Sequence, residues 1–261
     1  MQYNELLNLI KKEDISNFEY LIKYKYRLDE NKIISKIKVN NILKDIKRSK
    51  SYPVQYIVGN VNFYGYIYKV NKNVLIPRFE TEELVENTIK LIKEKFKDKN
   101  ITILDICTGS GCIGITLKHE LNAEVTISDI SKKALKVAKE NSKDLDIKII
   151  HSDILKNIKE KYDVIISNPP YISNNEKIMD IVKNNEPNIA LYAPNEGLYF
   201  YEEILKNISN NLKKDYIIAF EIGEKQAKHI INIANKYLKN INIILKKDMQ
   251  NRDRMIFIMN K

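Results

Sequence analysis

After Asn100, strand-like runs of apolar and β-branched residues alternate with helical stretches, and this alternation restricts the fold more than any other feature. It predicts a mostly parallel sheet with helices on both faces. The predicted strands cover residues 101–106, 124–128, 147–150, 164–167, 216–221, 241–245 and 255–259. The last two are only nine residues apart. Because a helical crossover needs more chain than that, we expect an antiparallel hairpin at the sheet edge.

The residues before this region predict two smaller parts. Residues 1–51 carry apolar side chains at helical spacing, which predicts a small helical domain with breaks near residues 14–16, 29–31 and 40–41. Residues 52–76 are aromatic and β-branched with intervening proline and glycine, which predicts a β-hairpin linker. The third part, residues 77–261, opens with a helix expected over about residues 80–96 and carries the sheet. The apolar positions of the helical domain are Leu6, Leu7, Ile10, Phe18, Leu21, Ile22, Leu28, Ile33, Ile34, Ile37, Ile42, Leu43 and Ile46.

Composition excludes several classes of protein. No stretch approaches the ~18–20 consecutive apolar residues of a membrane span, and the first residues lack a signal-peptide layout, so we expect a soluble, cytoplasmic protein without a membrane partner. Cys107 and Cys112 fit no disulfide framework or zinc spacing, and the scattered histidines predict no metal site. The net charge of +10 favours an acidic partner such as RNA, a ribosome or an acidic protein, although dispersed lysines make compositional bias an equal explanation.

A glycine-containing turn follows the first predicted strand and indicates a cofactor site. The segment Cys107-Thr108-Gly109-Ser110-Gly111 comes between that strand and a helical pattern, at a strand end where open α/β sheets bind ligands. The turn matches neither the G-x-G-x-x-G dinucleotide pattern nor a P-loop, and it contains no basic residue. It therefore favours a nucleotide-like cofactor without phosphates.

Two acidic residues follow the next strands. Asp129 ends the second strand, where its carboxylate could accept hydrogen bonds from both ribose hydroxyls; the alternative is an N-cap for the helix after Ser131. Asp153 follows the third strand and is placed to meet an adenine amino group, with Ile154 against the ring. The alternative for Asp153 is a loop aspartate that caps the next turn.

The fourth strand leads into Asn168-Pro169-Pro170-Tyr171, the candidate catalytic loop. Two consecutive prolines fix the backbone and remove two donors, which leaves carbonyl groups free to accept. The Asn168 side-chain oxygen and the Pro169 carbonyl could hold both N–H bonds of a conjugated NH2 group and aim its lone pair at a sulfonium methyl group. Tyr171 would stack on the planar target or contact the methyl group. The alternative is a proline turn that merely ends a strand.

Together these motifs resemble the class I methyltransferases and, within them, the HemK/PrmC family of peptide chain release factor glutamine N5-methyltransferases. The likeness extends from about Tyr52 to the end of the chain. Segments 53–59, 63–65, 74–82, 105–111, 168–171, 186–191, 221–226 and 248–254 carry it.

The resemblance implies a seven-stranded Rossmann-like sheet that binds S-adenosyl-L-methionine and releases S-adenosyl-L-homocysteine. It also implies that Cys107 to Gly111, Asp129 and Asn168 border the cofactor, and that Asn168 to Tyr171 bind the glutamine of a Gly-Gly-Gln loop on release factors, whose methylation modulates translation termination. The helical domain would contribute to docking. The resemblance does not assign roles to Arg78, Glu80 and Glu82. One interpretation is that they form an exposed helix N-terminus, where acidic residues interact favourably with the helix dipole.

Three positions depart from the family. Cys107 stands where glycine is more common, segment 192–194 replaces a frequent Gly-Gly, and the helical domain is short. The catalytic loop alone also fits a glutamine methyltransferase that acts on a ribosomal protein, or an adenine N6-methyltransferase acting on a flipped base. A large target-recognition domain is missing from the pattern, so we expect no direct nucleic-acid substrate. A non-enzymatic binding module would predict decay of the cofactor turn or the loop, and neither has decayed.

Overall fold

The computed structural model describes residues 1–29, 31, 33–97 and 99–261. Seven strands form the central sheet in the order β10-β11-β9-β6-β3-β4-β5. They are β3 (Ile101–Ile106), β4 (Ala123–Asp129), β5 (Ile147–His151), β6 (Tyr162–Ser167), β9 (Leu212–Glu221), β10 (Ile241–Lys247) and β11 (Asp253–Asn260). Neighbouring strands are parallel except that β11 runs antiparallel to both β9 and β10.

The predicted strands are confirmed as elements of this mostly parallel α/β sheet. The predicted terminal hairpin is also present, with β10 at the edge and β11 inserted between β10 and β9. β9 starts four residues before the predicted Tyr216, because it extends through the polar residues Lys213 to Asp215, which hydrophobicity alone does not mark as strand.

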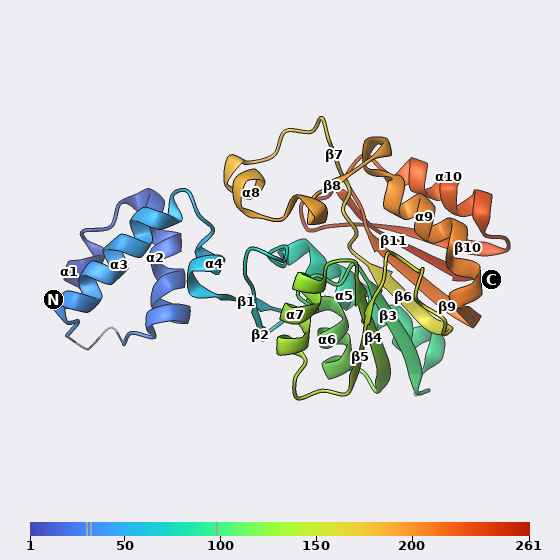
Figure 1. The fold of residues 1–261 in the computed structure, drawn as a ribbon, viewed down its shortest axis with the longest axis horizontal. Helices are drawn as coiled ribbons and strands as arrows, with labels where there is room; N and C mark the ends of the chain where they lie inside the picture. The colour runs from blue at the N-terminus through green and yellow to red at the C-terminus, as the bar shows by residue number, and fades with distance from the viewer. Residues whose placement is uncertain (30, 32, 98) are drawn as a thin grey trace.

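Helices cover both faces of the sheet (Figure 1). Alternate strand residues face opposite sides: Ile103 and Val164 pack with α5 (Phe79–Phe96), α6 (Cys112–Glu120) and α7 (Lys132–Asn141), whereas Leu104 and Ile165 pack with α9 (Tyr199–Asn207) and α10 (Ala227–Tyr237). A short helix, η5 (Ile208–Asn211), leads into β9. None of the described helices is both long and apolar enough to cross a bilayer.

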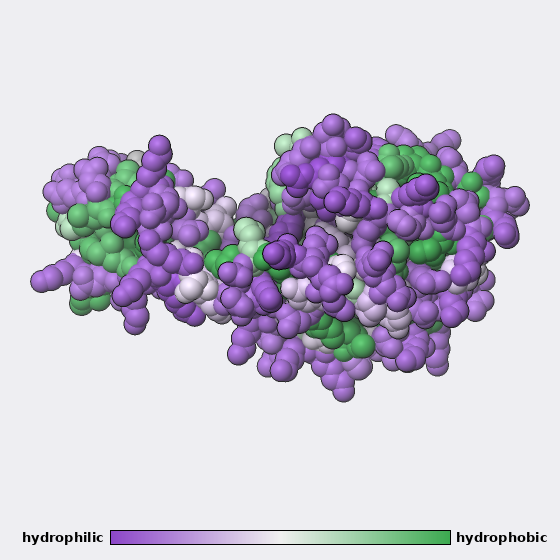
Figure 2. All heavy atoms as spheres, turned by 90° about the horizontal axis from the view of Figure 1, so that it is seen from above, coloured by the Kyte–Doolittle hydropathy of each residue, from purple (hydrophilic) through white to green (hydrophobic). Residues whose placement is uncertain are grey.

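The N-terminal residues form a separate small bundle around its own apolar cluster, joined to the larger lobe by a narrow neck (Figure 2). It contains α1 (Tyr3–Leu7), η1 (Lys12–Asp14), α2 (Ile15–Leu21), η2 (Ile22–Tyr26) and α3 (Lys36–Ser49). The predicted break at Asn40-Asn41 is wrong: α3 runs through it from its N-cap Ser35, because buried residues before and after the asparagines hold the helix on the core. Ile33 and Ile37 are exposed rather than packed in the bundle core. The break near Asp14 coincides with the start of α2, and part of the predicted break at 29–31 lies outside the described residues.

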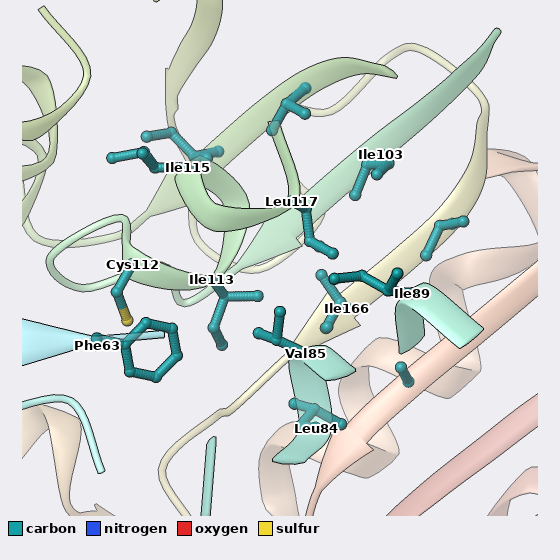
Figure 3. Packing of buried hydrophobic residues seen from close by; sticks show 14 of the residues in the cluster. Phe63, Leu84, Val85, Ile89, Ile103, Cys112, Ile113, Ile115, Leu117 and Ile166 are labelled. Carbon is teal, nitrogen blue, oxygen red and sulfur yellow. The ribbon is translucent and has the colours of Figure 1, made fainter. Parts of the chain in front are cut away.

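The connecting segment holds a one-turn helix as well as the hairpin. α4 (Val54–Val58) begins after Pro53 and ends at Gly59, whose φ of 84° suits the end of a helix. The hairpin β1 (Asn60–Phe63) and β2 (Tyr66–Lys69) follows. α4 packs on the bundle, whereas Phe63 reaches from β1 into the sheet cluster that also holds Ile113 of α6 (Figure 3).

An insertion between β6 and α9 lies on the same side of the molecule as the strand ends. It contains β7 (Ile172–Ser173), α8 (Asp180–Asn185), η3 (Asn188–Ala190), β8 (Tyr192–Ala193) and η4 (Asn195–Gly197). The strands β7 and β8 pair in parallel, which closes the insertion at its base. Segment 192–194, one of the departures from the family pattern, is therefore a short paired strand followed by Pro194.

Candidate active site

A cavity of about 270 Å³ lies at the carboxyl ends of β3, β4, β5 and β6. Its wall is built from the turn after β3, the ends of β4 and β5, the loop after β6, and residues of the insertion and α9. The chain before α5 adds Asn73, Val74, Leu75 and Pro77, and α5 itself adds Thr81. Among the described residues of this wall, the only charged side chains are the carboxylates of Asp129 and Asp153. The cavity therefore favours a cationic or neutral ligand over a phosphate.

The turn after β3 brings its backbone against this cavity. Cys107, Thr108, Gly109 and Ser110 all line it, and a Cβ atom on Gly109, whose φ is 55°, would meet nothing within 4 Å. The glycine thus leaves open room for a ligand to approach the chain. Gly111, also expected at the cofactor, does not line the cavity.

Gly111 instead serves the packing of helices. It is the N-cap of α6 with a φ of 85°, and a Cβ atom there would lie 2.7 Å from Ile115 Cδ1 and 3.3 Å from Ala138 Cβ. The same turn is braced from below by Asp105, whose Oδ2 accepts from Thr108 Oγ1 at 2.5 Å and from Gly114 N at 3.0 Å. Burial raises the pKa of Asp105 to about 7.

Asp129 lines the cavity at the end of β4 and also fixes the turns around it. Its Oδ2 accepts from Gly109 N at 2.9 Å and its Oδ1 from Ser131 N at 2.8 Å. The N-cap of α7 is the Ser131 side chain, which accepts from Ala134 N. Burial raises the pKa of Asp129, and the backbone N–H groups oppose this shift. The carboxylate is thus held rigidly at the cavity wall.

Of the two residues expected to contact an adenine ring, only one lines the cavity. Asp153 lines the cavity, and its Oδ2 accepts from Lys156 Nζ at 2.9 Å. Ile154 lies outside the cavity wall and packs on the α9 and α10 side of the sheet, because its φ of 51° turns the chain away. Ile130, which follows Asp129, lines the cavity in its place. Ser152 rather than Asp153 caps the following turn, since its Oγ accepts from Asn157 N.

The four residues of the candidate catalytic loop do not all face the cavity. Asn168 and Pro170 line it, whereas Pro169 and Tyr171 are absent from its wall. The expected stacking position of Tyr171 is not seen: its hydroxyl donates to Glu221 Oε1 at 3.2 Å, and its ring packs against the core near α9. Within the described part of the chain, no donor bonds to Asn168 Oδ1 or to the Pro169 carbonyl oxygen.

A buried network behind the loop was not anticipated from the sequence. Asn168 Nδ2 donates to Thr81 Oγ1 at 3.2 Å, and Thr81 Oγ1 donates to Glu221 Oε2 at 2.6 Å. Thr81 comes from α5 and Glu221 from the end of β9. Burial raises the pKa of Glu221, and the hydroxyl of Thr81 and the charge of Arg254 oppose this shift.

Gln226 holds the other end of the loop. Its Nε2 donates to the Tyr171 carbonyl at 2.9 Å, and its Oε1 accepts from Gly223 N at 2.9 Å. Gly197 fits closely against this contact, since a Cβ atom there would lie 2.0 Å from the Tyr171 carbonyl oxygen. The loop is therefore fixed on both sides before any ligand binds.

The chain is similar to known proteins over most of its length. A model of the methyltransferase small domain matches residues 80–185. The release factor glutamine methyltransferase of Streptococcus pneumoniae is 37% identical over 98% of this chain and 88% of its own length. This chain belongs to that family. The release factor glutamine methyltransferase of Flavobacterium psychrophilum is 42% identical over 82% of this chain and 77% of its own length.

Solved structures give the same fold. A methyltransferase from Pyrococcus furiosus superposes with a TM-score of 0.55 at 15% identity, covering 84% of this chain and 95% of that one. At such low identity the likeness concerns the fold alone. It confirms the expected class of sheet, in which the cavity lies at the strand ends.

Of the three signature residues whose roles the sequence left open, Arg78 ties the start of the methyltransferase core to its insertion. Arg78 Nη2 lies 2.5 Å from Glu186 Oε1, and Glu186 Oε2 accepts from Ile76 N at 3.0 Å. Glu80 and Glu82 lie in the first turn of α5, where carboxylates interact favourably with the helix dipole. Arg78 is thus a brace between the chain before α5 and the insertion after β6.

Cys107, which replaces the glycine more common in this family, has a φ of 60°. This left-handed conformation explains why glycine suits the position. The thiol lines the cavity, and burial raises its pKa above the ordinary range. The other thiol, of Cys112, also lines the cavity and has its pKa raised by burial to about 12.

We expect both thiols to react slowly with iodoacetamide. The thiolate is the reactive form, and the raised pKa values keep both groups protonated at pH 7.5. Alkylation followed by peptide mass spectrometry should give rates at least ~10-fold below that of glutathione at pH 7.5. Rates equal to that of glutathione would contradict the protonated state, and denatured protein provides the control for full reactivity.

Proposed function

We propose that this chain transfers one methyl group from S-adenosyl-L-methionine to the side-chain nitrogen, N5, of the glutamine in the Gly-Gly-Gln motif of peptide chain release factors. The observation that carries the proposal is the fixed direction of the Asn168 amide. Because its Nδ2 donates to Thr81, its Oδ1 is the polar atom left for a ligand in the cavity. An acceptor at that point suits an NH2 group and not a carboxylate or phosphate.

The cavity residues fit this cofactor. S-adenosyl-L-methionine supplies an electrophilic methyl group on a positively charged sulfonium, and its release leaves S-adenosyl-L-homocysteine. Asp129 and Asp153 line the cavity and would provide the negative charge that complements it, and Asp129 would accept hydrogen bonds from the ribose hydroxyls. The open space beside Gly109 admits the cofactor close to the backbone, and Ile130 offers an apolar surface for a base.

The loop after β6 would hold the target amide. Asn168 Oδ1 and the Pro169 carbonyl each accept one N–H bond, which orients the nitrogen lone pair toward the methyl group. The same two oxygens stabilise the positive charge that develops on nitrogen during transfer. Because that charge makes the nitrogen acidic, its proton can leave to solvent without a dedicated base. Tyr171 supports the loop from behind, through Glu221, rather than stacking on the substrate.

The remaining assignments rest on the arrangement of the lobes. Residues 1–51 form the docking domain, residues 52–76 the linker and residues 77–261 the catalytic domain of the proposed enzyme. The release factor would bridge the bundle and the cavity, and no direct nucleic-acid substrate is required. We place the reaction in the cytoplasm, where release factors act.

Incubation of the enzyme with a release factor and S-adenosyl-L-methionine should add one methyl group, observed as about 14 Da by intact mass. Fragmentation of the peptide should place it on the glutamine of Gly-Gly-Gln. A release factor with that glutamine replaced by glutamate is the matched control, because it keeps the loop but lacks the NH2 group.

Two other substrates test the rivals. A ribosomal protein fraction tests the alternative glutamine substrate, and an adenine-containing RNA or DNA strand tests the base methyltransferase. Methylation of either of these, with the Gly-Gly-Gln peptide unmodified, would overturn the proposed substrate while leaving the cofactor assignment intact.

A further inference from the structure

We infer that Thr81 is a positioning residue. It sets the orientation of the Asn168 side-chain amide, so that the loop presents a hydrogen-bond acceptor and not a donor to its substrate. This inference rests on the proposed function. It concerns a residue 87 positions before Asn168 in the chain.

The direction of hydrogen bonds in the network follows from the number of protons available. A threonine hydroxyl has one proton, and that of Thr81 is donated to Glu221 Oε2 at 2.6 Å. Thr81 Oγ1 can therefore only accept from Asn168, 3.2 Å away. The group that faces it must be the NH2 group of Asn168, and the carboxamide oxygen is turned the other way.

Glu221 completes the constraint from the end of β9. Its second oxygen, Oε1, accepts from the Tyr171 hydroxyl at 3.2 Å, so both oxygens receive hydrogen bonds from hydroxyl groups. A carboxylate accepts at both oxygens and donates at neither. The side chain is 2% exposed, so water does not compete for these positions.

The opposite orientation of the Asn168 amide would not support methyl transfer. If Asn168 presented its NH2 group to the cavity, two donors would face each other when a substrate NH2 group arrived. That arrangement leaves both groups without an acceptor in a partly buried site, at a cost in binding and in orientation. Thr81 acts on the reaction through Asn168, whose Oδ1 is the atom proposed to touch the substrate.

A double-mutant cycle tests the inference. Thr81→Val removes the hydroxyl and keeps the shape, and we expect kcat for release factor methylation to fall ~10- to 100-fold. Thr81→Ser keeps the hydroxyl and should restore kcat to within about 3-fold of the parent. The Kd for S-adenosyl-L-homocysteine, measured by calorimetry, should change by less than about 3-fold in both variants.

The decisive comparison uses Asn168→Ala as background. If Thr81 acts through Asn168, adding Thr81→Val to that background should change kcat by less than about 2-fold, since the group it orients is already gone. An equal loss in both backgrounds would overturn the inference, because Thr81 would then act by its own contact with ligand or by general packing. Thr81→Ala allows the same cycle if thermal unfolding shows that the valine variant does not hold its fold.

Failure of the proposed function gives a different result. The parent enzyme would then leave the release factor unmethylated. Failure of this inference instead leaves an active parent, with Thr81→Val either as active as the parent or impaired to the same extent with and without Asn168→Ala. The two outcomes are separated by the parent reaction alone.

Discussion

Asn168→Ala should lower the rate of methyl transfer by at least ~100-fold while the Kd for S-adenosyl-L-methionine stays within about tenfold of the parent value. In the proposed reaction Asn168 Oδ1 orients the amide nitrogen and stabilises its developing charge, and both effects would be largest in the transition state. We expect cofactor binding to depend more on the turn after β3 and on Asp129, which line the cavity and which the substitution does not touch.

Single-turnover methylation of a release factor, with calorimetry for the cofactor, measures the two quantities separately. Asn235→Ala on the outer side of α10 is the matched control: among the described residues its Nδ2 bonds only to the carbonyl of Ile231, and the residue is exposed. It should retain the parent rate. Unchanged turnover in Asn168→Ala would remove this residue from the mechanism.

The inner strands of the sheet could be predicted from the sequence because they are largely buried on both faces. Largely apolar runs such as residues 101–106 and 164–167 carry that signal without strict alternation. The polar start of β9 carries no such signal, because its side chains are partly exposed at the end of the sheet. A hydrophobic pattern marks the apolar part of a strand and leaves its polar end unmarked.

Short elements were harder to predict because tertiary packing decides them. The segment around α4 has strand-like composition, yet Pro53 and Gly59 restrict it to one helical turn that packs on the bundle. Asn40 and Asn41 resemble a helix start, but both are exposed in the middle of α3. The intrinsic helix propensity of an asparagine changes helix stability by tenths of a kcal/mol per residue. The burial of Ile42 and Ile46 stabilises the helix by more than that.

At the cavity, the sequence located strand ends better than side-chain directions. It placed Asp129, Asp153 and Asn168 correctly near one another because parallel strands end at one edge. It also assigned Gly111, Ile154 and Tyr171 to ligand contacts, whereas backbone dihedrals and hydrogen bonds turn them into the protein. Thr81 was missed because its partners are 87 and 140 residues away. The only signal was its place within the 74–82 signature.

Arg78→Ala should lower the free energy of unfolding by about 2 kcal/mol, and Tm by about 4–8 °C. The substitution leaves the Glu186 side chain, 2% exposed, with the Ile76 N–H as its one remaining partner among the described residues. Loss of one partner from a fully buried pair costs ~3–5 kcal/mol, and we expect less because the Arg78 side chain is 34% exposed and water can screen the pair.

Lys90→Ala is the matched control, because Lys90 Nζ also lies 2.5 Å from its partner, Glu86 Oε1, but both side chains are about half exposed. Its Tm should stay within about 1 °C of the parent, since exposed pairs contribute little. The double variant Arg78→Ala/Glu186→Gln should recover at least about half of the lost stability, because it no longer buries an unpaired charge.

Hydrogen exchange then locates the effect. Because Arg78 and Ile76 both hold Glu186, we expect faster exchange in residues 180–191 of the insertion than in the sheet when Arg78 is removed. If exchange rises equally everywhere, or if Arg78→Ala unfolds no earlier than Lys90→Ala, the pair is not the brace that joins the insertion to the chain before α5. A selective rise would identify Arg78 as the residue that keeps the insertion against the cavity in which the proposed methyl transfer takes place.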